Sequence, residues 1–405
     1  MNHIDLLTRL AVESDNRIVL LVLDGVGDIR TRDQPATALD RAELPNMDAL
    51  ARRSALGRIV PVAQGVTPGS GPGHLALFGY DPTDPEADIG RGVLEALGLG
   101  LKIGPGDLAA RGNFATTDAD GNLTDRRAGR IPTSECQRLV DSLQADLSSF
   151  EEAEIEVVAG EEHRFVLILR GSGYSAEVAD TDPQKTGVQP LSPQPMRPGA
   201  EPTAALLAKI IARMNHVIAD EPKANAVLLR GVSHLPTLPQ FPDLYHLRAG
   251  AFAGYPLYRG VAGACGMEVV PCGKYFHEMV PTVRKNWSRF DFFFVHVKQA
   301  DKAGEDGDLK AKIQVLEQVD AALPELLALE PTVLAITGDH STPAPMASHS
   351  WHPVPLLLHS PVCFADDCQE FTETAATRGH LGTFPACELM GLLLANAGRL
   401  AKYGA

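Results

Sequence analysis

The chain contains one continuous apolar stretch that decides its fold, Arg17-Ile-Val-Leu-Leu-Val-Leu-Asp24. An uninterrupted apolar run of this length predicts a strand that is buried on both faces, as the strands of a parallel sheet are. Two later runs repeat the design, Phe292-Phe-Phe-Val-His-Val297 and Thr332-Val-Leu-Ala-Ile-Thr337, and polar residues follow each run within a few positions. Ligands of open α/β sheets bind where the strands end, so we expect a functional site at this edge.

Helical patterns between these strands predict how the sheet is covered. Residues 44–53 and 309–327 place apolar side chains three or four positions apart, which is the spacing of one helix face. The alternation of strands and helices favours an α/β fold, in which a mostly parallel sheet is covered on both faces by helices.

The middle of the chain has shorter apolar runs and more turn residues than the rest, which predicts a second domain. Residues 107–125 and 155–180 read as shorter strands joined by turns, and a Pro-rich stretch precedes a helix at residues 203–215. We therefore predict a smaller α/β domain, residues 105–242, inserted into a larger discontinuous domain of residues 1–104 and 243–405.

The composition limits the partners and the compartment. The chain has 405 residues, of which 44% are hydrophobic and 21% charged, enough to bury two cores. Its formal net charge of −15 disfavours nucleic acid and anionic membranes, because neither is attracted to an acidic surface. No stretch resembles a signal peptide or reaches membrane-spanning length, so a cytoplasmic location is expected. The six cysteines are scattered without a Cys-x-x-Cys pair and are expected to be buried thiols.

The residues that carry chemistry come from four places that the sheet would bring to one edge. They are Asp24, Ser70, Asp301, Asp339, His340 and His349. Carboxylates mixed with imidazoles suit borderline divalent cations such as zinc or manganese. Two such ions could clamp a phosphoryl group from both sides, and one of them could hold a serine alkoxide for attack.

Ser70 lies in a glycine-rich turn that is expected to open a helix near His74. The segment reads Val66-Thr-Pro-Gly-Ser-Gly-Pro-Gly-His-Leu-Ala-Leu-Phe-Gly-Tyr-Asp81. A serine at a helix N-terminus would have backbone N–H groups and the helix dipole directed at an incoming phosphate. Taken by itself, the segment fits a plain Ser/Gly/Pro loop better. Its glycine spacing matches neither the dinucleotide-binding fingerprint nor a P-loop.

The strongest single signal follows the third apolar run. Asp339-His340-Ser-Thr-Pro343 is followed by His349-Ser-Trp-His352, so three histidines stand close together beside an aspartate at a strand end. Metal ligation explains this cluster better than three separate structural histidines do.

Several motifs, taken together and in chain order, resemble the archaeal-type cofactor-independent phosphoglycerate mutases of the alkaline phosphatase superfamily. They are Leu23-Asp24-Gly25, Gly79-Tyr-Asp-Pro82 after the Ser70 turn, Gly90-Arg-Gly92 with Glu95-Ala96, Arg111-Gly-Asn-Phe-Ala-Thr116, Asp125-Arg-Arg-Ala-Gly-Arg130, Asp180-Thr-Asp-Pro183, Leu229-Arg-Gly231, His296-Val-Lys298, Asp301 and Thr337-Gly-Asp-His-Ser-Thr-Pro343. The resemblance covers nearly the whole chain. It implies an alkaline-phosphatase-like three-layer α/β domain with a mostly parallel sheet, and an inserted smaller α/β domain.

The same resemblance implies the metal ligands and the nucleophile. Asp24, Ser70, Asp339 and His340 would hold one divalent metal ion, and Asp301, Glu305 and His349 would hold the other. Ser70 would take the phosphoryl group from phosphoglycerate and return it to the other hydroxyl.

Position 305 departs from the family pattern. The segment Asp301-Lys-Ala-Gly-Glu305-Asp-Gly307 carries a glutamate where these mutases usually have a histidine. A glutamate is a harder, anionic ligand, which should shift the preference toward manganese or magnesium and away from zinc. His352 stands where the family often has an acidic or amide residue, so we hypothesise that His352 is a substitute ligand.

Substrate recognition needs cations for a carboxylate and a phosphate, and bidentate arginine forks suit both groups. The resemblance assigns this role to Arg111, Arg127, Arg130 and Arg230 of the inserted domain, and to His74, Lys274 and Lys298. His74 has the alternative role of capping the Ser70 turn, and a pair such as Arg126-Arg127 is normally solvated surface. The segment Asp180-Thr-Asp-Pro183 is either an ordinary turn or an ordered loop near the site, with the turn slightly favoured.

These observations give a leading function and two alternatives. The leading one is an isomerase of glycolysis or gluconeogenesis that interconverts 3-phosphoglycerate and 2-phosphoglycerate through phospho-Ser70. It would use two divalent metal ions, manganese first and magnesium or zinc as alternatives, and no 2,3-bisphosphoglycerate. The first alternative is a metal-dependent phosphatase or phosphodiesterase, in which water intercepts the phosphoserine and an arginine-rich domain has little purpose. The second is a non-catalytic metal- or metabolite-binding protein, which Glu305 alone suggests and the presence of Ser70 opposes.

Overall fold

The computed structural model describes residues 3–84, 87, 89–150 and 152–404, and it divides the chain into two compact units. The larger unit is Met1–Asp88 with Thr237–Ala405, and the smaller unit is Ile89–Pro236. The sequence analysis places the junctions at residues 105 and 242 instead. The first junction lies earlier because helix α5 (Arg91–Gly98) packs on strands of the smaller unit.

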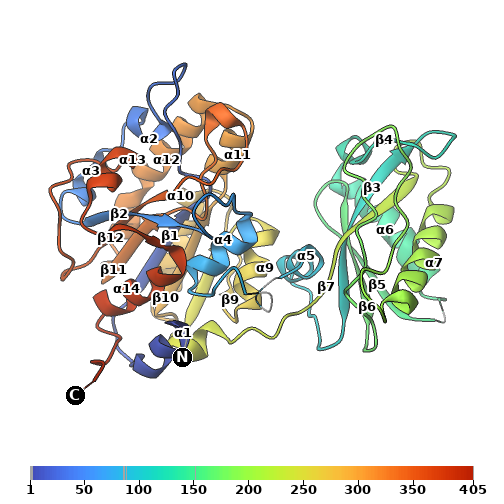
Figure 1. Ribbon diagram of the computed structural model, residues 1–405, viewed down its shortest axis with the longest axis horizontal. Coiled ribbons are helices and arrows are strands. Elements are labelled where there is room, and N and C mark those ends of the chain that lie inside the picture. Colours follow the sequence, from blue (N-terminus) through green and yellow to red (C-terminus); the bar gives the residue numbers. More distant parts are fainter. Residues whose placement is uncertain (1–2, 85–86, 88, 151, 405) are drawn as a thin grey trace. The chain divides into compact units, whose positions relative to one another are not determined.

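The larger unit is built on an eight-stranded sheet with the order β13-β2-β12-β11-β1-β10-β8-β9 (Figure 1). The strands are β1 (Ile18–Leu23), β2 (Ala55–Val60), β8 (Ala249–Ala253), β9 (Glu268–Val269), β10 (Phe292–Val297), β11 (Val333–Thr337), β12 (Val354–His359) and β13 (Gly382–Pro385). All neighbouring pairs are parallel except the two that β12 makes, with β11 and β2. The predicted mostly parallel sheet is confirmed.

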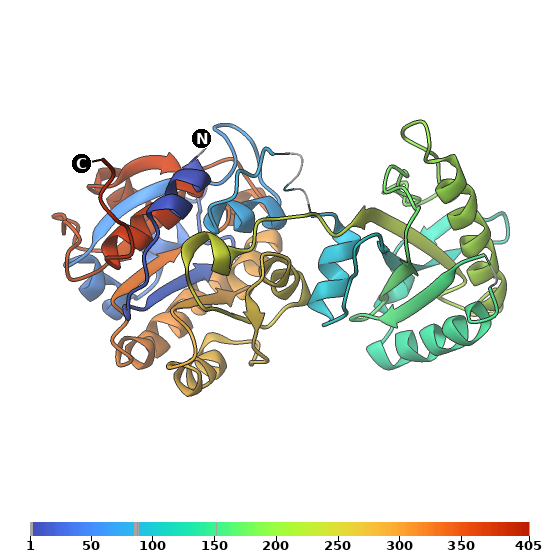
Figure 2. The same ribbon diagram turned by 90° about the horizontal axis from the view of Figure 1, so that it is seen from below.

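Helices cover both faces of this sheet and give the unit three layers (Figures 1 and 2). They are α1 (His3–Leu10), α2 (Ala38–Arg41), α3 (Pro45–Ala51), α4 (Ser70–Leu77), α8 (Phe241–Tyr245), α9 (Pro256–Ala264), α10 (Phe276–Lys285), α11 (Gln299–Glu305), α12 (Leu309–Leu327), α13 (Glu373–Arg378) and α14 (Leu389–Asn396). On one face α12 packs against α10, α3 and α2, and on the other α4 packs against α9. Because both faces are covered, every residue of β1 and β10 is buried, as their apolar sequences predict.

Strand register explains why polar residues gather at one edge. The central strand β1 pairs in parallel with β10 on one side and β11 on the other, so that Val22 lies beside both His296 and Thr337. Three parallel neighbours in this register end at the same level. The residues that follow them therefore meet at the carboxyl edge, where the sequence analysis expects the site.

The smaller unit has an antiparallel sheet and is also of the α/β class. Its strands are β3 (Leu108–Thr117), β4 (Leu123–Asp125), β5 (Glu154–Ala159), β6 (Arg164–Arg170) and β7 (Ala226–His234), in the order β4-β3-β6-β5 with β7 paired to β3. Helices α6 (Thr133–Leu147) and α7 (Glu201–Val217) pack together, and their apolar side chains form a core with one face of the sheet. Helix α5 packs on β3 and β7. The predicted inserted α/β domain is thus present as a separate body.

Two further features bear on the sequence expectations. No helix in the described part of the chain is long and apolar enough to cross a membrane. All six cysteine thiols are free, and two of them, Cys136 and Cys265, are buried.

Candidate active site

Two carboxylates, an imidazole and a serine meet where β1 and β11 end. Asp24 follows β1, Asp339 and His340 follow β11, and all three side chains are fully buried. His340 Nε2 lies 3.3 Å from Asp24 Oδ1, 3.3 Å from Asp339 Oδ2 and 3.3 Å from Ser70 Oγ. One ligand atom from each of the two aspartates and from His340 lies within 4.8 Å of the others. The structure therefore brings together the four residues that the sequence analysis assigns to one ion.

Several carboxylate oxygens of this group make ion pairs but accept no well-aligned hydrogen bond from the described residues. Within the described residues, neither carboxylate oxygen of Asp24 accepts a well-aligned hydrogen bond, and neither does Asp339 Oδ2. They have ionic neighbours instead, with Asp24 Oδ2 3.2 Å from His296 Nε2 and Asp339 Oδ2 3.2 Å from His74 Nδ1. A buried polar atom without a hydrogen bond costs about 1–3 kcal/mol, and a divalent cation would satisfy these oxygens. Burial alone would raise the pKa of Asp24, but the Lys298 ammonium and two neighbouring imidazoles hold it well below its ordinary value. The carboxylate is thus kept in the charged form that binds metal, and the donor set fits such an ion.

A second group of possible ligands lies next to the first. Asp301 and Glu305 are four residues apart in α11 and therefore share a helix face. His349 Nε2 lies 3.4 Å from Asp301 Oδ1 and 3.6 Å from Glu305 Oε1. His349 Nδ1 donates to the Pro68 carbonyl at 3.0 Å, which leaves Nε2 directed at the two carboxylates. The rings of His340 and His349 stack with centroids 3.7 Å apart, so the two groups are in contact.

Lys298 lies between the two groups. Its Nζ is 3.3 Å from Asp24 Oδ2, and it also pairs with Asp301. It lies 5.4 Å from the centroid of the Tyr258 ring. Burial alone would lower the pKa of Lys298, but the charges of Asp24 and its neighbours raise it above the ordinary value. Lys298 is therefore a fixed positive charge at the centre of the site, where an anion would be bound.

His74 is buried behind Ser70. Its Nδ1 lies 2.7 Å from the Ser70 carbonyl oxygen and 3.2 Å from Asp339 Oδ2. Its ring packs against those of Tyr258 and His296, with centroids 4.9 and 5.0 Å away. The His74 side chain has no exposed surface and lies within hydrogen-bond distance of the Ser70 backbone. Of the two alternatives for His74, the geometry favours support of the Ser70 turn over substrate binding.

Helix α4 begins at Ser70 itself, four residues before the expected start at His74. Gly69, which precedes the helix, is extended, with φ −87° and ψ 164°. Pro72 fits the first turn because N–H groups there have no partner within the helix. A Cβ on Gly73 would lie 2.4 Å from the Asp339 carbonyl oxygen, so only glycine lets the helix approach this closely. Ser70 is therefore the first residue of a helix N-terminus, a position that attracts anions.

The smaller unit gathers arginines on one face of its sheet. In the antiparallel register, Arg111 lies opposite Arg230, and Asn113 lies opposite Arg164. Because alternate residues of a strand share a face, these four side chains project from the same side of the sheet. Like charges directly opposite each other destabilise a sheet. This face therefore has the character of an anion-binding site.

The arginines of this face keep unused donors. Among the described residues, the Nε atoms of Arg111 and Arg164 are buried without a hydrogen-bond partner. Burial lowers the pKa of Arg111 to about 10, and the nearby Arg164 charge adds to the effect. Burial also lowers the pKa of His163 to about 4, reinforced by Arg164, Arg111 and then Arg127 and Arg130. Four arginines thus surround one neutral imidazole.

The loop that carries Arg127 and Arg130 has an unusual backbone. Asp125 accepts hydrogen bonds from the N–H groups of Arg127 and Gly129, each at 2.7 Å. Three consecutive residues there have positive φ, 48° at Ala128, 63° at Gly129 and 52° at Arg130. Two of them are not glycine, and strain of this kind tends to persist where function needs it. The Asp125 hydrogen bonds and the positive φ angles thus give the loop that carries Arg127 and Arg130 a defined conformation.

Arg126, by contrast, is used inside the protein. Its guanidinium donates to the two carboxylate oxygens of Asp182 at 2.8 and 2.7 Å. Asp182 also lies 3.4 Å from Arg230 Nη1, and Asp180 lies 3.6 Å from Arg230 Nε. The segment 180–183 is therefore an ordered loop that orients Arg230, and the ordinary-turn alternative is not the one observed.

Sequence reasoning missed the residues that strand register brings together, Arg164, His163 and Asn113. His163-Arg164 stands at the start of an apolar run and reads as an ordinary strand entry. The available signal was weak, since a single cation before a strand is usually solvated.

Two predicted residues lie elsewhere. His352 Nδ1 lies 3.0 Å from Ser350 Oγ and its ring stacks on Trp351, so its near contacts are with neighbours in the chain. Its role as a substitute ligand stays a prediction. Lys274 Nζ lies 5.6 Å from the centroid of the Tyr255 ring, and its contact with substrate stays a prediction.

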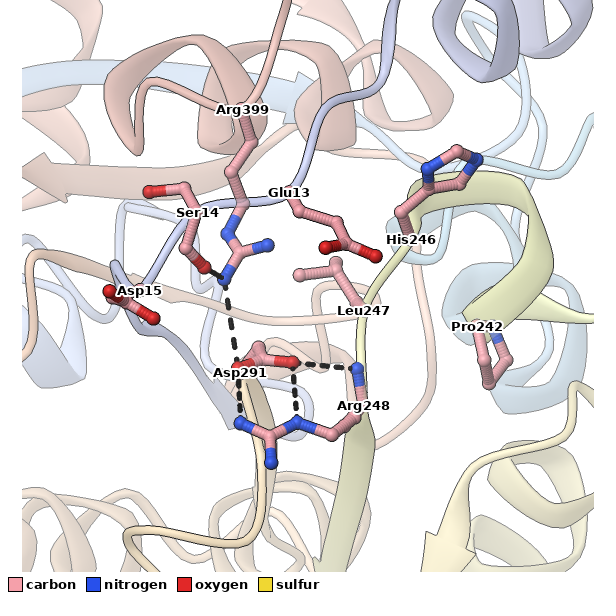
Figure 3. A pocket seen from close by; sticks show the side chains of 9 residues that line it. All are labelled: Glu13, Ser14, Asp15, Pro242, His246, Leu247, Arg248, Asp291 and Arg399. Atoms are coloured by element: carbon pink, nitrogen blue, oxygen red, sulfur yellow. Dashed lines mark hydrogen bonds and ion pairs between the residues drawn. The ribbon is translucent and has the colours of Figure 1, made fainter.

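A cavity of about 580 Å³ lies at the opposite, amino edge of the large sheet (Figure 3). Asp291, which directly precedes β10, accepts hydrogen bonds from the Arg248 side chain at 2.9 and 2.8 Å, and Arg399 Nη2 lies 3.7 Å from it. Arg399 also donates to the backbone carbonyls of Ser14 and Asn16. None of the described side-chain atoms that are buried without a partner belongs to this cavity. Its Asp291 is paired with two arginines, so we place the site at the carboxyl edge.

The fold and the site together define the class of this protein. It is an α/β protein with a serine and a carboxylate–imidazole centre suited to divalent metal at the carboxyl edge of its main sheet. A family model described as 2,3-bisphosphoglycerate-independent phosphoglycerate mutase matches residues 51–224.

Relatives extend that match over the whole chain. A probable 2,3-bisphosphoglycerate-independent phosphoglycerate mutase of Thermus thermophilus is 49% identical, over 100% of both chains. One of Thermotoga neapolitana is 48% identical over 98% of each. The solved structure of a cofactor-independent phosphoglycerate mutase from Thermoplasma acidophilum is 30% identical, covers 95% of this chain and 100% of that one, and has a TM-score of 0.70. The chain belongs to the 2,3-bisphosphoglycerate-independent phosphoglycerate mutases, which are isomerases.

Proposed function

We propose that this protein interconverts 3-phosphoglycerate and 2-phosphoglycerate by passing the phosphoryl group through Ser70, without 2,3-bisphosphoglycerate. The observation that carries the proposal is the position of Ser70, at the start of α4 and 3.3 Å from His340 Nε2. A hydroxyl in this place has the oriented N–H groups, the carboxylates and the cation that phosphoryl transfer needs. The names of the relatives support the same reaction.

Two divalent metal ions, manganese first, would complete the site. Asp24, Ser70, Asp339 and His340 would hold one ion, and Asp301, Glu305 and His349 would hold the other. When bound, the ions neutralise phosphoryl charge and polarise its oxygen atoms. Glu305 favours manganese or magnesium over zinc, because a carboxylate is a harder ligand than the imidazole it replaces.

Ser70 performs the transfer in two steps that conserve atoms. Its Oγ attacks the phosphorus of 3-phosphoglycerate, and the bond from phosphorus to the C3 oxygen breaks. The proton that the Ser70 hydroxyl loses passes to the C3 oxygen, which leaves a C3 hydroxyl and a phosphoserine. The C2 hydroxyl of the same glycerate then attacks that phosphorus, which forms 2-phosphoglycerate and restores Ser70. The N–H groups at the start of α4 and the Lys298 ammonium stabilise the transferred group.

The arginine face of the smaller unit would hold the glycerate between the two steps. We assign this role to Arg111, Arg127, Arg130 and Arg230 as the sequence analysis does, and we add Arg164. A guanidinium binds a carboxylate through two parallel hydrogen bonds, and the unused donors of Arg111 and Arg164 are available for them. Holding the glycerate matters because its release would leave the phosphoserine to water.

The test is a time course with 3-phosphoglycerate and manganese that follows 2-phosphoglycerate and free phosphate together. We expect 2-phosphoglycerate without matching phosphate release. In Ser70→Ala the product should fall by more than about 1000-fold, because the covalent route is lost. Ser348→Ala, an exposed serine, is the matched control and should retain full activity. Release of phosphate alone would show that the protein is a hydrolase. No reaction with any divalent metal would contradict both the mutase and the hydrolase activity.

A further inference from the structure

The loops that carry the metal-binding side chains are tied to each other through their backbones. The loop after β1 and the loop after β11 form bridges between Val26, Gly27 and Ser341. The Thr342 N–H donates to the Gly27 carbonyl at 3.1 Å. Asp24 lies on the first loop and Asp339 on the second. The position of one carboxylate therefore depends on how the two loops are joined.

A buried lysine of another helix holds both loops. Lys312 of α12 has no exposed surface, and its Nζ donates to the Gly27 carbonyl at 3.1 Å and the Thr342 carbonyl at 2.9 Å. Within the described residues it pairs with no carboxylate. Burial lowers the pKa of Lys312, and only more distant acidic groups such as Asp28 oppose this. Burying a cation whose partners are two neutral carbonyls carries an unfavourable desolvation free energy. By bonding both carbonyls, Lys312 fixes the distance between the two loops.

The Thr342 side chain joins the two groups of ligands. Its Oγ1 donates to Asp301 Oδ1 at 2.5 Å and lies 3.0 Å from His340 Nδ1. Because the hydroxyl has one proton and gives it to the carboxylate, it accepts the proton of His340 Nδ1. His340 Nε2 then faces Asp24, Asp339 and the Ser70 hydroxyl, on the side where the first ion would be held. One hydroxyl thus fixes the ring orientation of a ligand in the first group and the direction of a carboxylate in the second.

Close packing leaves Thr342 no room to move. A Cβ on Gly304 would lie 2.3 Å from the Thr342 carbonyl oxygen, and one on Gly25 would lie 2.5 Å from Thr342 Oγ1. Both glycines therefore admit the backbone or the hydroxyl of Thr342 to within contact distance. The residue is surrounded by elements that each carry part of the site.

We propose that Thr342 and Lys312 form a positioning pair, in which Thr342 couples the two groups of metal ligands and Lys312 fixes the loops that present them. The pair touches neither the substrate nor the reacting atoms. This inference rests on the proposed metal centre, and it concerns how tightly and in what number the ions are held.

The test is the affinity and stoichiometry of Mn²⁺ binding, measured by calorimetry on metal-free protein without substrate. Thr342→Val keeps the shape of the side chain and removes the hydroxyl, and it should weaken Mn²⁺ binding about 10- to 100-fold, as is typical for partners of metal ligands. Thr342→Ser restores the hydroxyl and should bind within about threefold of wild type. At saturating Mn²⁺, Thr342→Val should lower kcat and leave KM for phosphoglycerate nearly unchanged.

Lys312→Met tests the second half of the pair, with Lys310→Met as its control, since Lys310 lies exposed on the same helix. We expect weaker Mn²⁺ binding in the first variant and wild-type binding in the second. If Lys312→Met does not fold, the comparison of Thr342→Val with Thr342→Ser decides. Wild-type affinity in Thr342→Val would overturn the inference even if the mutase activity is established. Absence of Mn²⁺ binding by the wild type would overturn the proposed metal centre as well.

Discussion

Both edges of the eight-stranded sheet carry aspartates of low exposure, but the partners of these aspartates differ between the edges. At the carboxyl edge, the buried carboxylates of Asp24 and Asp339 crowd around one imidazole, each with an oxygen 3.3 Å from His340 Nε2. At the amino edge, Asp291 is held by two hydrogen bonds from Arg248 and approached by Arg399 (Figure 3). Buried charge by itself does not mark function, since it occurs at both edges. Like charges crowded together do, because Asp24 disfavours the charged form of Asp339 and folding alone would not bring them together.

Two arginines of the smaller unit show a similar contrast. Arg126 gives its donors to Asp182, whereas Arg111 keeps a buried Nε without a described partner. The donors of Arg126 stabilise the fold, and the Nε donor of Arg111 is available to a ligand. The comparison therefore predicts which substitutions affect activity and which affect stability.

The largest effect should follow from Asp339→Asn at the carboxyl edge. Losing this carboxylate should reduce kcat/KM by more than about 1000-fold, since it removes a metal ligand at the reacting centre. It should also remove the share of the Mn²⁺ stabilisation that comes from this ion, about 3 kcal/mol at a hundredfold excess over its Kd. Urea unfolding with and without Mn²⁺ measures this. A variant that Mn²⁺ still stabilises fully would break the comparison.

The next largest effect separates the two arginines. Arg111→Met should raise KM for phosphoglycerate or lower kcat/KM by about 100-fold, as expected for the loss of a charged hydrogen-bonding group. Arg126→Met should act mainly on the smaller unit's stability and on the placement of Arg230, with a smaller loss of kcat/KM. Steady-state kinetics and urea unfolding of both variants distinguish these results. Equal losses of kcat/KM in Arg111→Met and Arg126→Met would mean that the hydrogen bonds of an arginine within the fold do not predict its role in activity.

At the amino edge, Arg399→Met should lower the free energy of unfolding by about 3 kcal/mol, because it removes a buried guanidinium that bonds two backbone carbonyls. The loss should be the same with and without Mn²⁺, and kcat should not change at a temperature where the variant is folded. Unfolding curves at two Mn²⁺ concentrations check this. A metal-dependent loss would show that the amino edge is coupled to the site.

The smallest effect concerns the choice of metal. Glu305→His should change the ratio of zinc-supported to manganese-supported activity by several-fold in favour of zinc, because an imidazole is the softer ligand. Asp306→Asn, which removes the exposed carboxylate next in the chain, is the control and should leave the ratio unchanged. Activities after dialysis into each metal give the ratio. An unchanged ratio in Glu305→His would remove Glu305 from the proposed ligands.

Local sequence patterns were enough to predict the central part of the fold. The apolar runs at 17–24, 292–297 and 332–337 correspond to β1, β10 and β11, and residues 309–327 form α12. Strands at the margin, such as β13, escaped because they are short and largely exposed, so their composition carries no burial signal. The junction before α5 escaped because it depends on packing between distant segments.

The site was predictable to the extent that its residues follow strand ends. Asp24, Asp301 and Asp339 were found in this way, since parallel strands bring such residues to one edge. Arg164 depends on antiparallel register across strands, and Lys312 reads as one more lysine of an amphipathic helix. Pairing and burial of this kind arise only in the folded chain, so neither residue could be singled out from its neighbours in the sequence.

The central claim, transfer through Ser70, is tested most directly by mass spectrometry of the enzyme quenched in acid while it turns over 3-phosphoglycerate with Mn²⁺. We predict one phosphoryl group on the peptide that contains Ser70, absent from Ser70→Ala and from wild type quenched without substrate. Phosphate on another residue, or none in an enzyme that is forming 2-phosphoglycerate, would contradict the account.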